Sequence, residues 1–229
     1  MPIAGVVRSR SVALVATLAL SGCGYQVTDP EPTEIVMVVA GGGVQAGVAG
    51  APLASLLVVR VTDRTGDPIP RFPVTFAVPP GGGTISSRNV TDLRGIAVAS
   101  WTLPTRVGTY RATAASGLDT LQFAATATAG PGTLLQLLEG GNQTGVAGQA
   151  LPAEVVVRVT DQYGNGVVGT TVAFVAPLGN GMALTPLAES NSSGVVRTTW
   201  VLGTVPGPME LRAKVANLGR IFITATATP

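Results

Sequence analysis

Leu56-Leu-Val-Val-Arg-Val-Thr-Asp63 is the stretch that decides the fold, because the chain repeats it as Glu154-Val-Val-Val-Arg-Val-Thr-Asp161, 98 residues later. Both stretches are rich in Val, and each contains a Thr; these residues favour the pleated, half-buried surface of a β-strand. The repeat extends to both sides: Val48-Ala-Gly50 returns as Val146-Ala-Gly148, and Val74-Thr-Phe76 returns as Val172-Ala-Phe174. Self-similarity at such an offset indicates two copies of one domain.

A second set of matches lies further along, at an offset of 99 residues, because one residue is inserted in the second copy. These matches pair Gly95 with Gly194, Trp101 with Trp200, Gly108 with Gly207, and Phe123 with Phe222. We therefore expect one domain over residues 33–129 and another over residues 133–229. The short segment Ala129-Gly-Pro-Gly132 is the expected hinge between them.

Each copy contains about seven short runs with strand composition, separated by turn-forming residues. In the first copy we expect strands near residues 34–40, 54–63, 69–78, 84–91, 95–103, 108–115 and 120–128. Gly41-Gly-Gly43 and Gly81-Gly-Gly83 are expected to be loops, because no Lys-Ser/Thr follows them as in a phosphate-binding loop. The pattern predicts an all-β chain.

Alternation of apolar and polar residues indicates which side chains face each core. The apolar sets are Ala97, Ala99, Trp101 and Leu103 in the first copy, and Val196, Thr198, Trp200, Leu202, Met209, Leu211, Ala213 and Val215 in the second. Both tryptophans are therefore expected inside, where burial of a large aromatic side chain stabilises a domain without disulfides. Most other aromatic residues are also expected to face inward, except Tyr25 and Tyr163, which argues against strong glycan binding.

The repeated Val-Arg-Val-Thr-Asp, the turn after it, Val-Thr-Phe, and the Ser-Gly-Val of residues 193–195 together resemble the bacterial Ig-like group 1 domain. That domain is repeated in the invasin and intimin family of bacterial surface proteins. The resemblance covers residues 34–229 and implies two tandem immunoglobulin-like β-sandwich domains, a secreted or surface location, and a stalk or adhesion role. The chain shows no outer-membrane barrel and no terminal lectin-like domain, so receptor-contacting residues are not carried over.

The amino terminus resembles a lipoprotein signal. Arg8 and Arg10 precede a short apolar run that ends in Leu20-Ser21-Gly22-Cys23, which looks like a lipobox. A run of this length is typical of a cleaved secretory signal, and it is too short to span a bilayer. We expect a signal peptide over residues 1–22, lipidation of Cys23, and an extended tether over residues 23–32. Gly24 rather than aspartate after the cysteine resembles the outer-membrane sorting pattern of diderm bacteria.

Composition argues against several other functions. Loss of the two signal arginines leaves 12 basic and 12 acidic residues, so the sequence shows neither the net charge nor the basic patch of a nucleic-acid-binding protein. The chain contains no histidine, which removes the usual general base and the commonest zinc ligand. The single lysine, Lys214, and the sparse carboxylates predict neither a Ser-Lys site nor a catalytic acid pair. We expect no enzyme activity and no cofactor.

Calcium binding at the two repeated turns is an alternative to simple turn formation. Asp63 with Asp67, and Asp161 with Asn165, place oxygen atoms four residues apart. Calcium takes six to eight oxygen ligands, and two side chains per turn fall short of that number. Turn formation is therefore the favoured interpretation of these four residues.

Two functional hypotheses follow. The first is a membrane-anchored lipoprotein that acts as a non-catalytic surface interaction or spacer module, with a role in cell adhesion. The alternative is a periplasmic accessory subunit or carbohydrate-binding module of an envelope complex. The expected contacts are the membrane, through the lipid on Cys23, and an unidentified protein or glycan partner.

Overall fold

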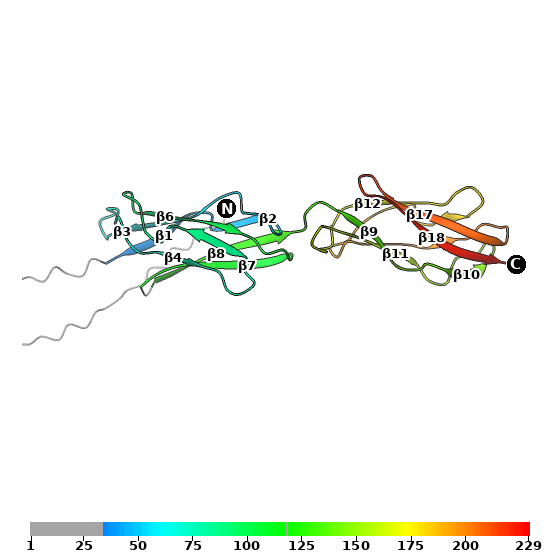
Figure 1. Ribbon diagram of the computed structural model, residues 1–229, viewed down its shortest axis with the longest axis horizontal. Coiled ribbons are helices and arrows are strands. Elements are labelled where there is room, and N and C mark those ends of the chain that lie inside the picture. Colours follow the sequence, from blue (N-terminus) through cyan, green and yellow to red (C-terminus); the bar gives the residue numbers. More distant parts are fainter. Residues whose placement is uncertain (1–33, 118) are drawn as a thin grey trace, which may run out of the picture. The chain divides into compact units, whose positions relative to one another are not determined.

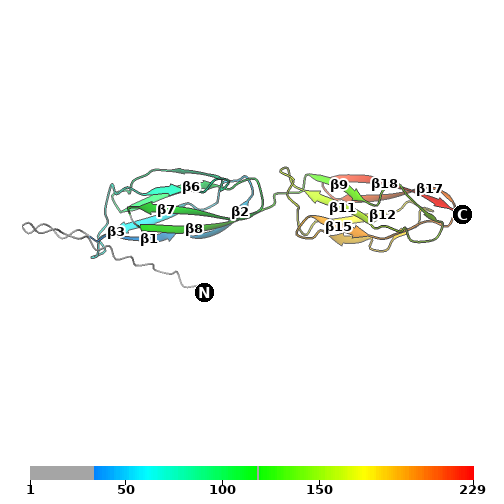
Figure 2. The same ribbon diagram turned by 90° about the horizontal axis from the view of Figure 1, so that it is seen from below.

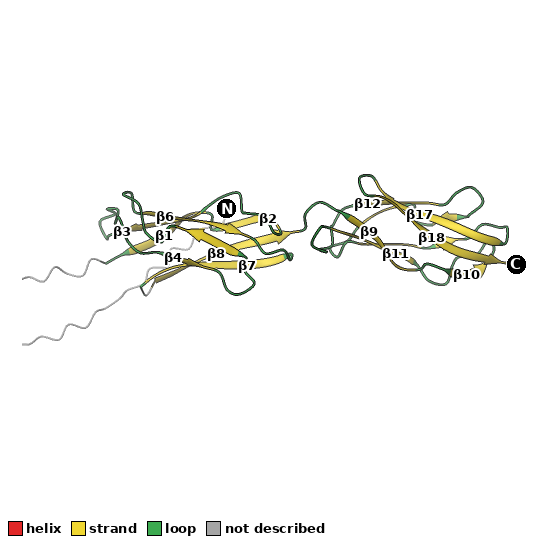
Figure 3. Ribbon diagram, in the orientation of Figure 1, coloured by secondary structure: helices red, strands yellow, loops and turns green. Residues whose placement is uncertain are grey.

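The computed structural model describes residues 34–117 and 119–229, and every regular element in these two ranges is a β-strand (Figure 3). The chain divides into two compact units between Ala127 and Thr128 (Figure 1). Each unit consists of two groups of strands around one buried core. The predicted all-β fold with two tandem immunoglobulin-like sandwiches is confirmed.

The first unit has two four-stranded sheets, with strand orders β1-β3-β6-β5 and β2-β8-β7-β4. Its strands are β1 (Val36–Gly41), β2 (Val44–Val48), β3 (Leu57–Thr62), β4 (Thr75–Ala77), β5 (Thr84–Ser87), β6 (Ile96–Thr102), β7 (Gly108–Ser116) and β8 (Asp119–Thr128). Buried side chains from both sheets form a single core, which includes Leu57, Trp101 and Phe123.

The first expected strand, residues 34–40, continues into a second strand that the sequence pattern did not predict. β1 pairs with β3 in one sheet, whereas β2 lies beside β8 in the other sheet. Gly42 lies at the crossing with a φ of 69°, and a Cβ atom there would lie 2.2 Å from the Leu56 carbonyl oxygen. Only glycine tolerates this backbone conformation and approach, so the glycine run lets the chain change sheets.

The third expected strand, residues 69–78, is reduced to the three residues of β4. Pro70 and Pro73 have no N–H to donate to a strand ladder, and Arg71 has a φ of 57°. The chain before β4 therefore forms turns and isolated bridges instead of a continuous strand.

The second unit is also built from strands alone (Figure 2), and it repeats this architecture with one additional edge strand. Its strands are β9 (Leu134–Glu139), β10 (Gln143–Val146), β11 (Val155–Thr160), β12 (Thr171–Val175), β13 (Met182–Ala183), β14 (Leu187–Glu189), β15 (Val195–Thr198), β16 (Trp200–Val201), β17 (Gly207–Val215) and β18 (Gly219–Thr228). One face consists of β15-β11-β9 with the pair β13-β16, and the other of β10-β18-β17-β12-β14. β14 extends the larger sheet by pairing with β12.

Both tryptophans lie inside, as predicted. Trp101 is 1% exposed and Trp200 is fully buried. The indole N–H of Trp101 donates to the Gly82 carbonyl oxygen at 2.8 Å, and that of Trp200 donates to the Asn180 carbonyl oxygen at 2.9 Å. The loop before β5 or β13 therefore supplies the acceptor that a buried indole requires.

The predicted equivalence of Phe123 and Phe222 is wrong. Phe123 is 1% exposed, but Phe222 is 54% exposed, and Ile223 takes the buried place instead. The β7–β8 turn joins paired residues Ser116 and Asp119, whereas the β17–β18 turn joins Val215 and Gly219 and is one residue longer. Because side chains alternate across a strand, one inserted residue moves the matched phenylalanine to the outer face.

Candidate functional site

Asp63 and Asp67, the first pair of calcium candidates, lie together on the turn after β3. Oδ1 of Asp63 accepts hydrogen bonds from the backbone N–H groups of Thr65 at 2.9 Å and Asp67 at 3.0 Å. The Thr65 hydroxyl lies 2.7 Å from Oδ1 of Asp63 and 3.1 Å from Oδ2 of Asp67. The hydrogen bond from the Thr65 side chain is the largest cause that holds the pKa of Asp63 below its ordinary value.

Asp161 and Asn165, the second pair, are in direct contact and both are buried. The Asn165 side-chain amide donates to Asp161 Oδ2 at 2.9 Å, and backbone N–H groups of Gly130, Tyr163 and Asn165 donate to the same carboxylate at 2.9–3.0 Å. Burial pushes the pKa of Asp161 upward, but the hydrogen bonds from Asn165, Gly130 and Tyr163 together outweigh it and lower that pKa.

The two carboxylates therefore accept hydrogen bonds from their own turns, as turn-forming residues do. Within residues 34–117 and 119–229, no group of three Asp, Glu, Cys or His side chains is arranged to hold a metal ion. Turn formation stays the prediction for Asp63, Asp67, Asp161 and Asn165, with calcium binding as the alternative hypothesis. The predicted lipobox residues Leu20, Ser21 and Gly22, and the lipidation site Cys23, lie outside the described residues.

Asp92 and Glu154, two further carboxylates near strand ends, make local contacts. Asp92 caps the turn before β6 by accepting from the backbone N–H groups of Arg94 at 2.8 Å and Ile96 at 2.9 Å. Glu154 lies 3.5 Å from Arg197 in an exposed ion pair. These contacts describe local structural roles.

The outer face of the β17–β18 hairpin carries an arrangement that the sequence analysis missed. Arg212, Lys214, Arg220 and Phe222 point away from the core, and we call these four residues the basic face. Arg212 pairs across the strands with Phe222, and Lys214 pairs with Arg220. The guanidinium carbons of Arg212 and Arg220 lie 5.7 Å and 5.5 Å from the centroid of the Phe222 ring, within cation–π distance.

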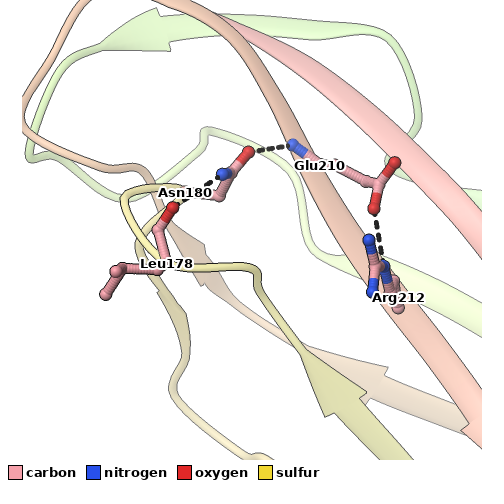
Figure 4. Close-up of polar contacts among 4 residues, drawn as sticks. All are labelled: Leu178, Asn180, Glu210 and Arg212. Carbon is pink, nitrogen blue, oxygen red and sulfur yellow. Dashed lines mark hydrogen bonds and ion pairs between the residues drawn. The ribbon is translucent and has the colours of Figure 1, made fainter.

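A hydrogen-bonded chain positions one end of the basic face (Figure 4). Asn180 Oδ1 accepts from the backbone N–H of Glu210 at 2.6 Å, and Glu210 Oε1 accepts from Nε of Arg212 at the same distance. Asn180 also donates from its side-chain amide to the Leu178 carbonyl oxygen at 3.3 Å. The loop before β13 therefore fixes β17 where Arg212 begins the basic face.

The expectation that the chain has no basic patch is corrected by this arrangement. A hairpin brings Arg220 beside Lys214, although five residues lie between them in the sequence. The alternation of Ile221, Ile223, Ala225 and Ala227 was the signal that could have placed Phe222 outside.

Tyr163, which was expected outside, is 45% exposed.

The first unit has the same hairpin without the basic face. The register pairs Thr113 with Gln122 and Ala115 with Thr120, at the positions that correspond to Arg212–Phe222 and Lys214–Arg220. None of these four side chains carries a charge. The charged face is therefore a feature of the second unit and is not required by the fold.

No protein-family model matches the sequence, and no curated protein matches it either. Among solved structures, the chain is similar to InvD of Yersinia pseudotuberculosis, with 18% identity, a TM-score of 0.55, and coverage of 85% of this chain and 57% of InvD. It is also similar to the Escherichia coli adhesin FdeC, with 18% identity, a TM-score of 0.49, and coverage of 83% of this chain and 63% of FdeC. A third similar structure is the Yersinia pseudotuberculosis adhesin InvE, with 14% identity, a TM-score of 0.39, and coverage of 85% of this chain and 59% of InvE.

The likeness to InvD shows a shared fold. The resemblance to invasin- and intimin-type Ig-like domains, first suggested by the repeated sequence, is therefore confirmed at the level of the fold. The chain spans less than two thirds of the length of each of these three structures.

Proposed function

We propose that this protein is a lipid-anchored envelope lipoprotein whose two Ig-like units form a non-catalytic surface interaction or spacer module with a role in cell adhesion. The observation that carries the proposal is the tandem pair of Ig-like units with the InvD-like fold, preceded in the sequence by the lipobox-like Leu20-Ser21-Gly22-Cys23. Cys23 is the only cysteine of the chain, and lipidation uses the thiol that would otherwise stay unpaired in an exported protein. Gly24 supports sorting to the outer membrane.

Non-catalytic interaction fits the chemistry of the described residues. The chain has no histidine, and the carboxylates of Asp63, Asp92 and Asp161 accept hydrogen bonds within their own turns. Within residues 34–117 and 119–229, no helix is long and apolar enough to cross a membrane. Attachment in this proposal depends on the lipid, because several acyl chains on one residue anchor a protein far more firmly than one chain does.

Replacing Cys23 with serine is expected to release the protein from membranes without unfolding either unit. The serine hydroxyl does not take the lipid, and residue 23 precedes β1, the first described strand, in the sequence. Partitioning between detergent and aqueous phases checks this: the unaltered protein should enter the detergent phase and C23S the aqueous phase. Retention of C23S in the detergent phase would contradict the proposed anchor.

Protease digestion of intact cells tests the surface location. Loss of the second unit on an immunoblot, while a periplasmic control protein survives, is the result that the proposal expects. A folded sandwich can resist cleavage, so the same digestion must also be shown to cleave the unit in lysed cells. Survival in intact cells with cleavage after lysis would place the protein in the periplasm and favour an accessory subunit of an envelope complex.

A further inference from the structure

We propose that the basic face of the second unit binds an acidic polysaccharide, one whose sugars carry carboxylate or sulfate groups. This inference rests on the proposed surface interaction function and names the chemistry of its partner. It places Arg212, Lys214 and Arg220 in direct contact with the anionic groups, with Phe222 holding the two guanidinium groups apart.

The basic face gathers positive charges on one surface of a unit whose formal net charge is zero. Residues 128–229 contain five basic and five acidic side chains, and three of the five basic ones belong to this face. Glu210 lies 2.6 Å from Arg212, and Glu189 lies on the outer edge strand β14. Among the described residues, no acidic side chain forms an ion pair with Lys214 or Arg220, so these two positive charges are available to a ligand.

Lys214 and Arg220 are directly opposite each other on β17 and β18. Like charges at opposite positions of an antiparallel pair destabilise the sheet. The first unit avoids this repulsion, since Ala115 and Thr120 occupy the equivalent positions. The first unit therefore shows that the fold does not need charged residues at these two positions. The repulsion between the cations of the second unit favours an anion that binds between them and offsets it.

The surroundings of Phe222 favour an acidic glycan over a neutral one. Guanidinium groups from Arg212 and Arg220 lie at 5.7 Å and 5.5 Å from the ring centroid, so the ring packs against its own cations. Guanidinium groups pair bidentately with carboxylate and with other oxyanions. Recognition at this face therefore depends on charge, with the aromatic ring fixing the guanidinium groups.

The same geometry favours a polysaccharide over a protein. Protein interfaces are depleted of Lys but enriched in Arg and Phe, so residue type alone does not separate the two kinds of partner. The arrangement does: three of the four residues of the basic face are cations, and they lie together toward the turn end of the β17–β18 hairpin. Arg212 and Lys214 occupy alternate positions of β17, about 6.6 Å apart at a rise of 3.3 Å per residue, and Arg220 continues the charge onto β18. An extended, solvated chain with repeated anionic groups can contact all three side chains.

Binding of the purified protein to dextran sulfate, carboxymethyl dextran and neutral dextran tests the proposal, because the three share one glucan backbone. We expect binding to one or both charged dextrans, weakened by added salt, and none to neutral dextran. The variant R212T/K214A/R220T carries the residues of the first unit at these positions and should lose at least about tenfold in affinity, equivalent to about 1.4 kcal/mol. Thermal unfolding must show that this variant is folded.

The control variant R60T/R88T/R106T removes the same charge from exposed positions of the first unit and should bind the charged dextran like the unaltered protein. Equal weakening by both triple variants would show a net-charge effect and overturn the proposal. Binding to poly-glutamate but to neither charged dextran would overturn it in favour of an acidic protein partner.

The single lysine of the chain offers a second, independent measurement. Acetylation of Lys214 by an N-hydroxysuccinimide ester, followed by mass spectrometry, should slow when the charged dextran that binds is present and not with neutral dextran. An unchanged acetylation rate at saturating charged dextran would place the ligand elsewhere and overturn the proposal. These measurements use purified protein, so a negative result rejects the ligand and leaves the surface role to the protease test on cells.

Discussion

Replacing Trp200 with alanine is expected to lower the free energy of unfolding of the second unit by about 3–5 kcal/mol, as for large aromatic side chains removed from cores. Trp200 is fully buried among residues of both faces of the sandwich, including Val157 and Leu211. The substitution removes this packing and leaves the Asn180 carbonyl oxygen without the indole donor 2.9 Å away. Both losses act inside the core, where the surrounding strands relax only partly.

Hydrogen exchange measured on peptides from each unit separates the effect of W200A on the two cores. Peptides of β11 and β17 should lose protection, while peptides of β3 and β7 in the first unit keep theirs. Trp200→Phe is the matched control, because it preserves most of the packing and removes the hydrogen bond; we expect it to lose about 1–2 kcal/mol. Equal losses in W200A and W200F would contradict the view that packing is the larger contribution.

The elements that the sequence predicted best are those in which local pattern and tertiary environment agree. β17 alternates apolar and polar residues over its length, and Met209, Leu211, Ala213 and Val215 are all buried as expected. The Ser-Gly-Val signature also has a clear structural reason. Gly194 has a φ of 77°, and a Cβ atom there would lie 2.2 Å from the carbonyl oxygen of Val159, so the turn into β15 requires glycine.

The elements that the sequence failed to predict depend on information outside their own residues. β2 exists because the chain can change sheets at Gly42, and residues 44–48 have no composition that distinguishes them from a loop. The position of Phe222 depends on the length of the preceding turn, which a comparison of matched letters overlooks. The basic face was missed for the same reason, since it forms only when Arg220 and Phe222 pair with β17 in this register.

The repeated Val-Thr-Asp places an equivalent aspartate in each unit, so Asp63 serves as the control for Asp161. Asp161 is 3% exposed and accepts hydrogen bonds from the backbone N–H groups of Gly130, Tyr163 and Asn165. Replacing it with alanine leaves one buried and two part-buried donors without their acceptor, so D161A should lower the free energy of unfolding of the second unit by about 2–4 kcal/mol. Asp63 lies on a more exposed turn where water replaces the carboxylate, so D63A should destabilise the first unit much less than D161A destabilises the second.

The pH dependence of stability gives the sharper version of this test. The carboxylate of Asp161 has a lowered pKa in the folded protein, so its contribution to stability is present above the ordinary aspartate pKa of about 3.9. It is lost as the pH falls through the lower folded value. The difference in stability of the second unit between the unaltered protein and D161N should therefore be largest near neutral pH and shrink below about pH 4. Denaturant unfolding followed between neutral and acid pH checks this, and a constant difference across the range would show that Asp161 stabilises the turn without its charge.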